Sequence, residues 1–369
     1  IGDGTQYFGT EAYDFENSKK SKVQFGFEIS KEEYNYDLYR TEDGIQGEQF
    51  QQNEELRSST QFFAQYNMNF LDDLELEVGL NANLTSYTLD DQFASDMTDI
   101  SGEYNYSWIY SPRLNLKYTL NESDHLYGLI SHGYSIPTLE ETLTPDGLIN
   151  NDIKPEIGLN TEIGFRGMTN NEKWSYGLTA YQMLVKNLLV ARRTAADQFI
   201  GVNAGGSRHI GAELDLAYKM FNSGDWRSDF NLAYTYQKFT FTDFVDGEED
   251  YSSNELTGAI PNQVALGWTG GYKRLSLIIK YKYIDSMPMR DDNSIYSDAY
   301  SLLDIYTTKT IAIGAFDIGM SAGVNNVLDT DYASMILVNA GSFGGNAPRY
   351  FYPGLPINAF GRMSIRYNF

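Results

Sequence analysis

The sequence predicts an all-β fold, a transmembrane antiparallel up-and-down β-barrel, and three observations lead to this prediction. Apolar and polar residues alternate in segment after segment, and short and long connections alternate between these segments. Aromatic residues make up 15% of the chain. Outer-membrane barrels have strands with one lipid-facing side, short turns at one end of the strands and girdles of aromatic residues at both lipid interfaces. All three observations therefore point to the same fold class.

The alternation is clearest between residues 60 and 84. The apolar positions are Phe62, Ala64, Tyr66, Met68 and Phe70, followed by Leu74, Leu76, Val78, Leu80, Ala82 and Leu84. Successive side chains of a strand point to opposite faces, so each set forms one apolar face. The other face carries charges in the middle of the predicted strands, which favours a polar interior over a thin soluble sheet: Glu28, Lys117, Glu162, Asp215, Lys219, Asp229, Lys280 and Lys282.

Connection lengths support a membrane barrel, because every second turn of such a barrel faces the same side. Short connections are predicted near residues 71–74, 120–124, 169–173, 221–225, 269–273 and 311–315. Long connections are predicted near 86–103, 135–157, 186–207, 242–258 and 285–301, with 32–56 before this series and 327–357 after it.

The segments between these connections give about 14 strands, and residues 6–15 are a candidate for a further one. The last strand is predicted from Asn358 to Phe369. A strand with this alternation that ends on Phe resembles the signal by which outer-membrane proteins are recognised for insertion.

Composition excludes several other classes of protein. No stretch approaches the roughly 18 consecutive apolar residues of a membrane-spanning helix. The chain has no Cys, which excludes a disulfide framework and thiolate metal ligands. Acidic residues outnumber basic ones 50 to 27, giving a net charge of -23, whereas binding to nucleic acid requires a basic face. Acidic loops or a vestibule that attracts cations would each account for this charge.

Three motifs follow one another in the middle of the chain. Residues 132–141 read His-Gly-Tyr-Ser-Ile-Pro-Thr-Leu-Glu-Glu and include Pro137, Thr138 and Glu140. A loop then carries Lys154, Pro155 and Glu156, and the next predicted strand carries Glu162 and Gly164. Further motifs are Asn203-Ala204-Gly205, the pair Asn325 and Asn326, and the segment 348–354 before the closing strand. This series resembles the signature of the TonB-dependent receptors, at least over residues 125–369.

The resemblance implies a barrel of about 22 strands, of which this chain would supply about 14. The whole chain, residues 1–369, would then be a partial barrel domain with no plug domain in the sequence. The implied location is the bacterial outer membrane, in contact with membrane lipid and lipopolysaccharide. The implied function is active import of a scarce ligand, usually a ferric siderophore or another iron complex. Energy would come from the TonB complex, acting through the missing plug.

One departure from the family pattern bears on the ligand. The family often has Arg in an aromatic-Arg-x-Pro step, where this chain has Tyr134-Ser135-Ile136-Pro137. The difference weakens an assignment to the haem-uptake branch.

No arrangement of residues predicts an enzyme, a cofactor site or a metal site. The three His residues, His125, His132 and His209, lie on different segments without metal-ligand spacing. Cationic and aromatic side chains on the long loops would suit an anionic chelate, through charge-assisted hydrogen bonds and stacking. The candidates are Arg192, Arg193, Arg290, Arg349 and Tyr350. Arg192 and Arg193 would equally suit lipopolysaccharide contacts or salt bridges.

Two other functions are compatible with the sequence. One is a passive, porin-like channel of about 14 strands with a charged pore. The other is an accessory barrel that works with partner proteins in a larger envelope assembly.

Overall fold

The structure is a computed structural model, and it describes nearly the whole chain. The described residues are 2–18, 21–42, 44–93, 98–144, 147–195, 198–203, 205–246, 248–342 and 347–367. Strands dominate them, and α1 (Leu139–Thr142) is a single helical turn. In these described ranges no helix is both long enough and apolar enough to cross a membrane.

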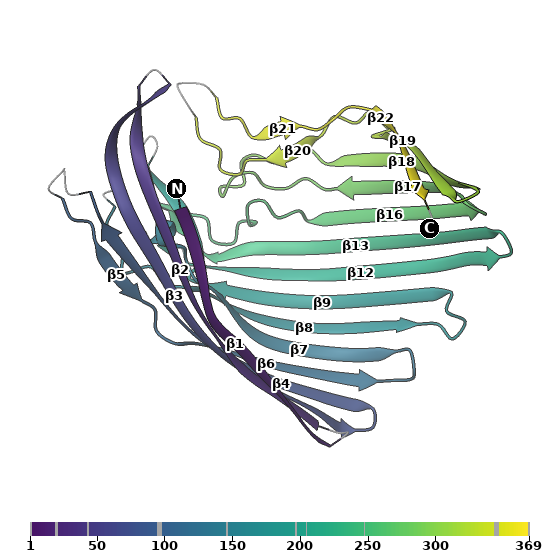
Figure 1. The fold of residues 1–369 in the computed structure, drawn as a ribbon, viewed down its shortest axis with the longest axis horizontal. Coiled ribbons are helices and arrows are strands. Elements are labelled where there is room, and N and C mark those ends of the chain that lie inside the picture. Colours follow the sequence, from purple (N-terminus) through teal and green to yellow (C-terminus); the bar gives the residue numbers. More distant parts are fainter. Residues whose placement is uncertain are drawn as a thin grey trace. The chain divides into compact units, whose positions relative to one another are not determined.

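The strands of the main sheet follow one another in chain order (Figure 1). They are β1 (Gly2–Ser18), β2 (Ser21–Glu42), β3 (Ile45–Leu71), β4 (Leu74–Asp91), β6 (Ile109–Thr119), β7 (His125–Ser135), β8 (Glu156–Met168), β9 (Trp174–Lys186), β12 (Gly206–Ser223), β13 (Trp226–Asp243), β16 (Asn262–Tyr272), β17 (Leu275–Ile284), β18 (Tyr300–Ile313), β19 (Phe316–Asn325) and β22 (Asn358–Tyr367). The short strand β5 (Gly102–Asn105) pairs with β4 beside this path. The order confirms an up-and-down topology, and β1 is the additional strand expected within residues 6–15.

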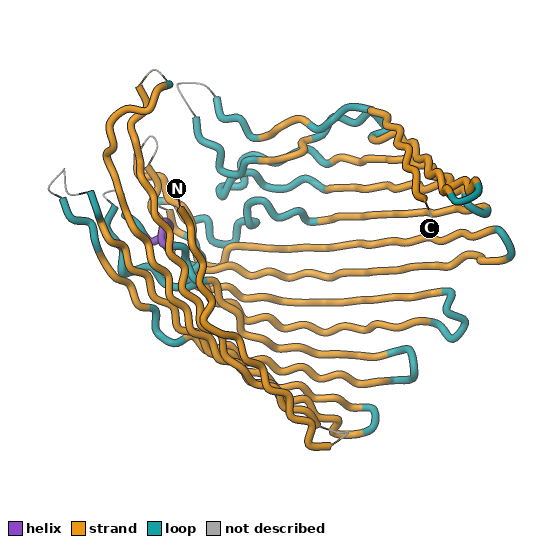
Figure 2. The backbone as a smooth tube through the Cα atoms, viewed as in Figure 1, coloured by secondary structure: helices purple, strands orange, loops and turns teal. Residues whose placement is uncertain are grey.

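From β3 onward, the predicted alternation of short and long connections is also confirmed (Figure 2). The short connections from β3 onward are residues 72–73, 120–124, 169–173, 224–225, 273–274 and 314–315. Three long connections contain two-stranded pairs of their own. These pairs are β10 (Leu189–Ala195) with β11 (Gln198–Asn203), β14 (Val245–Asp246) with β15 (Glu249–Asp250), and β20 (Ala333–Ile336) with β21 (Phe351–Pro353).

The prediction of a long loop over residues 32–56 was wrong. β2 and β3 run through this range as antiparallel partners, and their pairing continues to Glu42 opposite Ile45. β4 likewise continues to Asp91, into the predicted loop that starts at residue 86. Beyond Ile29 the apolar residues of β2 move from the odd to the even positions, so the alternation that indicated the strand is interrupted.

The chain divides into two compact units. The first unit consists of Ile1–Tyr118, Gly128–Thr161 and Leu184–Gly206. The second unit consists of Thr119–Tyr127, Glu162–Met183 and Ser207–Phe369. In the first unit, strand register aligns the apolar residues. Tyr66 of β3 lies between Val23 and Val78, and Val78 also pairs with Leu114 of β6. Tyr66, Val78 and Leu114 are all exposed, which is the arrangement of a lipid-facing surface. We call this side of β2–β6 the apolar face.

The opposite side of the same strands is polar, and we call it the polar face. Here Gln61 of β3 lies between Glu28 of β2 and Asn83 of β4. Beyond Ile29, the two sides of β2 exchange character, so that charged residues lie on the side that was apolar and aromatic residues on the side that was polar. Lys31, Glu33 and Asp37 continue the apolar face, whereas Tyr34 and Tyr36 continue the polar one. The apolar face of β2 therefore ends at Ile29, and the rest of the β2–β3 pair has a charged outer side.

A small hydrophobic core lies on the polar face of β4. Tyr87 and Leu89 of β4 are buried there with Tyr106 and Leu139 from the two long connections that follow β4 and β7. The rings of Tyr87 and Tyr106 meet edge to face, with centroids 6.1 Å apart. The connections are thus folded onto the strand by apolar contacts.

The second unit has the same two-faced construction. Trp268 of β16 lies between Phe230 of β13 and Ile279 of β17 on an apolar row. One position away, Lys280 lies between Gly267 and Asp304 on a polar row. A one-residue shift in register would exchange these faces, so the alternation also specifies the pairing.

Candidate functional site

The Pro137-Thr138 motif starts the single helical turn α1. The Thr138 Oγ1 accepts a hydrogen bond from the Glu141 backbone N–H, and a Glu141 carboxylate oxygen accepts one from the Thr138 backbone N–H, at 3.3 and 2.8 Å. This reciprocal pair is a capping box, which satisfies two otherwise unpaired helix donors. The Pro137 carbonyl accepts the Tyr87 hydroxyl at 2.8 Å. Glu140 lies within the helical turn. The motif therefore fixes the end of β7 against β4.

The Lys154-Pro155 motif is held by Asn203. The Asn203 side chain accepts the Lys154 N–H at 2.7 Å, and its amide donates to the carbonyls of Lys154 and Asn187. Asn187 in turn donates to the Pro155 carbonyl at 3.1 Å. Glu156 completes the arrangement, because its carboxylate accepts the backbone N–H of Leu189 at 2.7 Å. We call these contacts the Asn203 clasp. It joins the start of β8 to the base of the β10–β11 pair.

Gly164 lies where an aromatic ring crosses its strand. A Cβ at this position would be 2.3 Å from the Tyr127 ring, so any side chain would collide with it. The Tyr127 hydroxyl donates to Glu162 at 2.6 Å and lies 3.0 Å from the Thr179 hydroxyl. The Arg166 guanidinium lies over the Tyr127 ring at 5.5 Å. In the Glu-x-Gly pattern of β8, Gly164 thus leaves room for the Tyr127 ring and Glu162 accepts the hydrogen bond of its hydroxyl.

The Asn325 and Asn326 pair ends β19. The Asn325 amide donates to Asn358 of β22 at 2.8 Å. Asn326 is buried with a φ of 48°, a left-handed conformation that Asn tolerates better than most residues. Its side chain accepts the Thr330 N–H and donates to the Leu355 carbonyl. The two Asn side chains therefore connect the end of β19 to β22 and to the loop that follows β19. Phe369 lies outside the described residues.

Two of the predicted ligand-binding residues lie together in the second unit. Tyr350 is hydrogen-bonded to Arg290, and this bond is the main reason why the pKa of the Arg290 guanidinium is raised. Arg290 also forms an ion pair with Asp292 at 3.3 Å. Its positive charge is thus partly neutralised by a carboxylate two residues away. Arg349 is exposed beside Tyr350.

Arg192 and Arg193 lie in the other unit, on β10. Their backbones pair with Ile200 and Phe199 of β11, in the connection held by the Asn203 clasp. The structure therefore places the backbone of the predicted basic pair on the β10–β11 pair of the first unit, whereas Arg290 and Tyr350 belong to the second unit.

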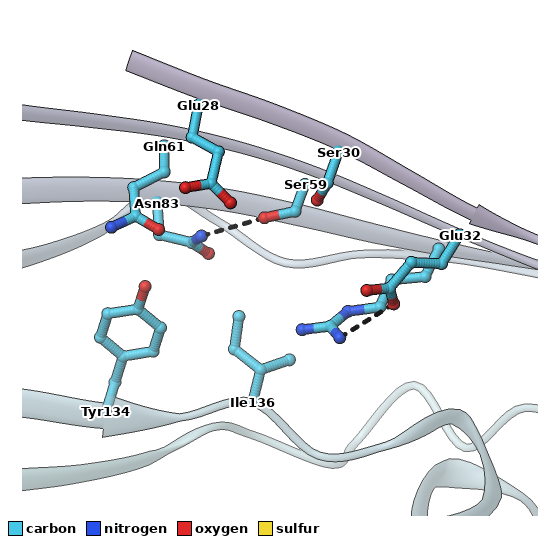
Figure 3. Close-up of a pocket in the computed structure, with 9 residues that line it drawn as sticks. Glu28, Ser30, Glu32, Ser59, Gln61, Asn83, Tyr134 and Ile136 are labelled. Atoms are coloured by element: carbon cyan, nitrogen blue, oxygen red, sulfur yellow. Dashed lines mark hydrogen bonds and ion pairs between the residues drawn. The ribbon is translucent and has the colours of Figure 1, made fainter. Parts of the chain in front are cut away.

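A polar pocket of about 250 Å³ lies in the first unit, on the polar face of β2–β4 (Figure 3). It is lined by Glu28, Ser30, Glu32, Arg57, Ser59, Gln61, Asn83, Tyr134 and Ile136. Figure 3 shows Tyr134 and Ile136 pointing from the end of β7 toward the strands above them. Within the pocket wall, Asn83 donates to Ser59 at 3.2 Å. Hydroxyl, amide and carboxyl groups thus face the pocket together.

The sequence alone did not identify this pocket. Glu28 was recognised as a charge in the middle of a strand, and Tyr134 as part of a motif. Their common surroundings depend on the register between β2, β3 and β4, which places Glu28, Gln61 and Asn83 in one row. One sequence signal does indicate a polar surface here: Glu28, Ser30 and Glu32 occupy alternate positions of β2, on the face away from its apolar residues.

The apolar face, the polar face and the strand order define a class of protein, the transmembrane antiparallel β-barrels. Residues 2–327 match the profile of a family described as TonB dependent receptor-like, beta-barrel. The chain belongs to this family, which consists of transport receptors of the bacterial outer membrane. A search of curated protein sequences gave no significant match.

Solved structures of such receptors share the fold. A structure described as the copper transporter OprC aligns with 100% of this chain and 56% of its own, at 18% identity and a TM-score of 0.75. The ferric citrate transporter FecA aligns with 96% of this chain and 52% of its own, at 14% identity and a TM-score of 0.75. The ferripyoverdine receptor of Pseudomonas aeruginosa aligns with 97% of this chain and 47% of its own, at 17% identity and a TM-score of 0.69. This chain thus spans about half the length of the structures that it matches.

Proposed function

We propose that the chain forms part of the wall of an outer-membrane receptor that actively imports a scarce ligand. The observation that carries the proposal is the family match over residues 2–327. The exposed apolar face of β2–β6 supports contact with membrane lipid and lipopolysaccharide. Energy would come from the TonB complex, acting on a plug inside the complete barrel.

The proposed cargo is a ferric siderophore or another metal complex. The similar structures are described as transporters or receptors for copper, ferric citrate and ferripyoverdine, which supports a metal complex as the cargo class. Arg192, Arg193, Arg290, Arg349 and Tyr350 remain the proposed contacts for an anionic chelate on the long connections. Arg290 is the weakest of the cations because Asp292 already pairs with it.

The experiment is an uptake assay in the native bacterium. Radioactive iron would be supplied as citrate, catecholate and hydroxamate chelates, and radioactive copper as Cu²⁺, to wild-type cells and to cells lacking the gene. The proposal predicts that at least one of these uptakes requires the gene, and that dissipating the proton gradient or removing TonB abolishes it.

Two results would contradict the proposal. One is uptake of all four probes that is unaffected by loss of the gene. The other is a steady open conductance of the purified full-length protein in a planar bilayer, which would indicate a passive channel.

A further inference from the structure

The two ends of the polar pocket differ in charge. At one end, the Arg57 guanidinium donates to Glu32 at 3.1 Å and lies 5.9 Å from the centre of the Tyr87 ring. Carboxylate and guanidinium charges cancel there, so this end offers no net positive charge to a ligand.

At the other end, Glu28 has no ion pair among the described side chains. Figure 3 shows its carboxylate beside Gln61 and Asn83, with the Tyr134 ring on the opposite side of the pocket. Ser30 and Ser59 add hydroxyl groups near the middle of the pocket. Among the described side chains, the Glu28 end therefore combines a carboxylate without an ion-pair partner, several hydrogen-bond acceptors and an aromatic ring.

We propose that the Glu28 end of this pocket binds a protonated amine of a small ligand. An ammonium group donates three hydrogen bonds and accepts none, which suits the carboxylate and hydroxyl oxygens of Glu28, Ser30 and Ser59. Aromatic rings such as that of Tyr134 attract organic cations through their negative faces. The inference rests on the proposed function, and it adds that the imported ligand carries a positively charged amino group.

Electrostatics favours a cation over an anion at this position. An anionic group would be repelled by Glu28, and Arg57, the one cation among the described residues that line the pocket, is already paired with Glu32. The formal net charge of -23 acts in the same direction at longer range, because it raises the concentration of cations near the protein. Thus the pocket prefers a cationic group, whereas the basic residues of the long connections would attract an anionic one.

The test measures binding of three small probes to the purified full-length protein in detergent. The probes are 1,4-diaminobutane, 1,4-butanediol and succinate, which have the same four-carbon chain and are cationic, neutral and anionic. Titration calorimetry is expected to detect binding of the diamine and weaker or no binding of the diol and of succinate.

Two variants locate the site, and a third controls for net charge. Glu28→Gln removes the charge with little change in shape, and we expect it to weaken diamine binding about tenfold. Tyr134→Leu removes the aromatic ring, and we expect a smaller loss. Glu33→Gln removes the same charge from the opposite face of the same strand, and we expect it to leave the affinity within about twofold of wild type.

Three results would overturn the inference. The first is equal weakening by Glu28→Gln and Glu33→Gln, which would mean that only the overall field acts. The second is binding of succinate as tight as that of the diamine. The third is no diamine binding to the wild-type protein, as expected if a basic side chain of the complete protein occupies the pocket. Unchanged TonB-dependent uptake together with any of these would reject the amine site and leave the proposed function standing.

Discussion

At the scale of single residues, the packing of Gly164 against Tyr127 gives a sharp prediction. Gly164→Ala would place a methyl carbon 2.3 Å from the Tyr127 ring, so the ring or the strand must move. Overpacking of this kind costs about 1–3 kcal/mol of folding free energy. We expect a lower midpoint of urea unfolding in lipid vesicles, and Tyr127→Ala in the same chain should restore part of the loss.

Gly133→Ala is the matched control for this change. No atom lies within 4 Å of a Cβ at Gly133, so its stability should stay close to that of wild type. Equal stability of the Gly164→Ala and Gly133→Ala variants would show that Tyr127 does not cross β8 as described.

The Asn203 clasp gives a second prediction. Asn203→Ala would leave the Lys154 N–H and the carbonyls of Lys154 and Asn187 without their partner. These groups are exposed or partly buried, and the loss of such a hydrogen bond costs about 0.5–1.5 kcal/mol, so the base of the β10–β11 pair should open more often. Hydrogen exchange of β10 and β11 should become faster, whereas exchange of β3 should not change.

Asn35→Ala provides the comparison, because Asn35 makes one long hydrogen bond of 3.4 Å at an exposed position. It is expected to leave exchange in β10 and β11 at the wild-type rate. Unchanged exchange in the Asn203→Ala variant would rule out the clasp as the element that holds this connection.

Because of Asp292, we expect the stability of the connection between β17 and β18 to depend on pH. Hydrogen bonds from Ser294, with a smaller contribution from Arg290, lower the pKa of the Asp292 carboxyl below its usual value of 3.8. A group with a lowered folded-state pKa stabilises the fold above its unfolded pKa, and this contribution is lost as pH falls through the folded value. Amides of residues 290–294 should therefore be protected at about pH 6 and lose this protection as the pH falls below the ordinary carboxyl value of 3.8, after correction for intrinsic exchange.

Asp292→Asn should remove this pH-dependent step, since the amide does not titrate in that range. Persistence of the same step in the variant would assign it to another carboxyl group.

At the scale of elements, the β2–β3 pair is longer than a membrane crossing requires. Its strands have 22 and 27 residues, whereas a tilted transmembrane strand needs about 9–11. The apolar face ends at Ile29, so the remainder of the pair should project into water. The chain has no Cys, which allows nitroxide labels to be attached at single introduced cysteines.

Phe25→Cys and Asp37→Cys test this projection, because both positions lie on the same face of β2. The label at position 25 should be more accessible to oxygen, which concentrates in lipid, and the label at position 37 more accessible to a water-soluble nickel chelate. A lipid-like accessibility at both positions would contradict a membrane boundary near Ile29.

The sequence predicted the strands well wherever the apolar face stayed on one side. It failed over residues 32–56 because the aromatic residues Tyr34 and Tyr36 change face there, and a strand whose polarity reverses resembles a loop. The motif positions were predicted, but their hydrogen-bond partners were not, since Asn203 and Lys154 lie 49 residues apart. The pocket was missed for the same reason, because Glu28, Gln61 and Asn83 meet only through strand register.

At the scale of the whole molecule, the account depends on the alternation of short and long connections along one strand order. In an up-and-down membrane barrel every second connection faces the same side, so from β3 onward the short turns would face the periplasm and the long connections the outside. The family match and the exposed apolar rows agree with such an arrangement. The pattern of accessibility in living cells is therefore the most direct consequence of the fold.

The measurement is labelling of single cysteines in the full-length protein with a maleimide that cannot cross the outer membrane. Positions Ser252, Ser294 and Ser334 lie in long connections, and Asp73, Asn170 and Ala315 lie in short ones. We predict labelling of the first three in intact cells, and of the last three only after the outer membrane is permeabilised. Labelling of short and long connections alike in intact cells would contradict the membrane barrel.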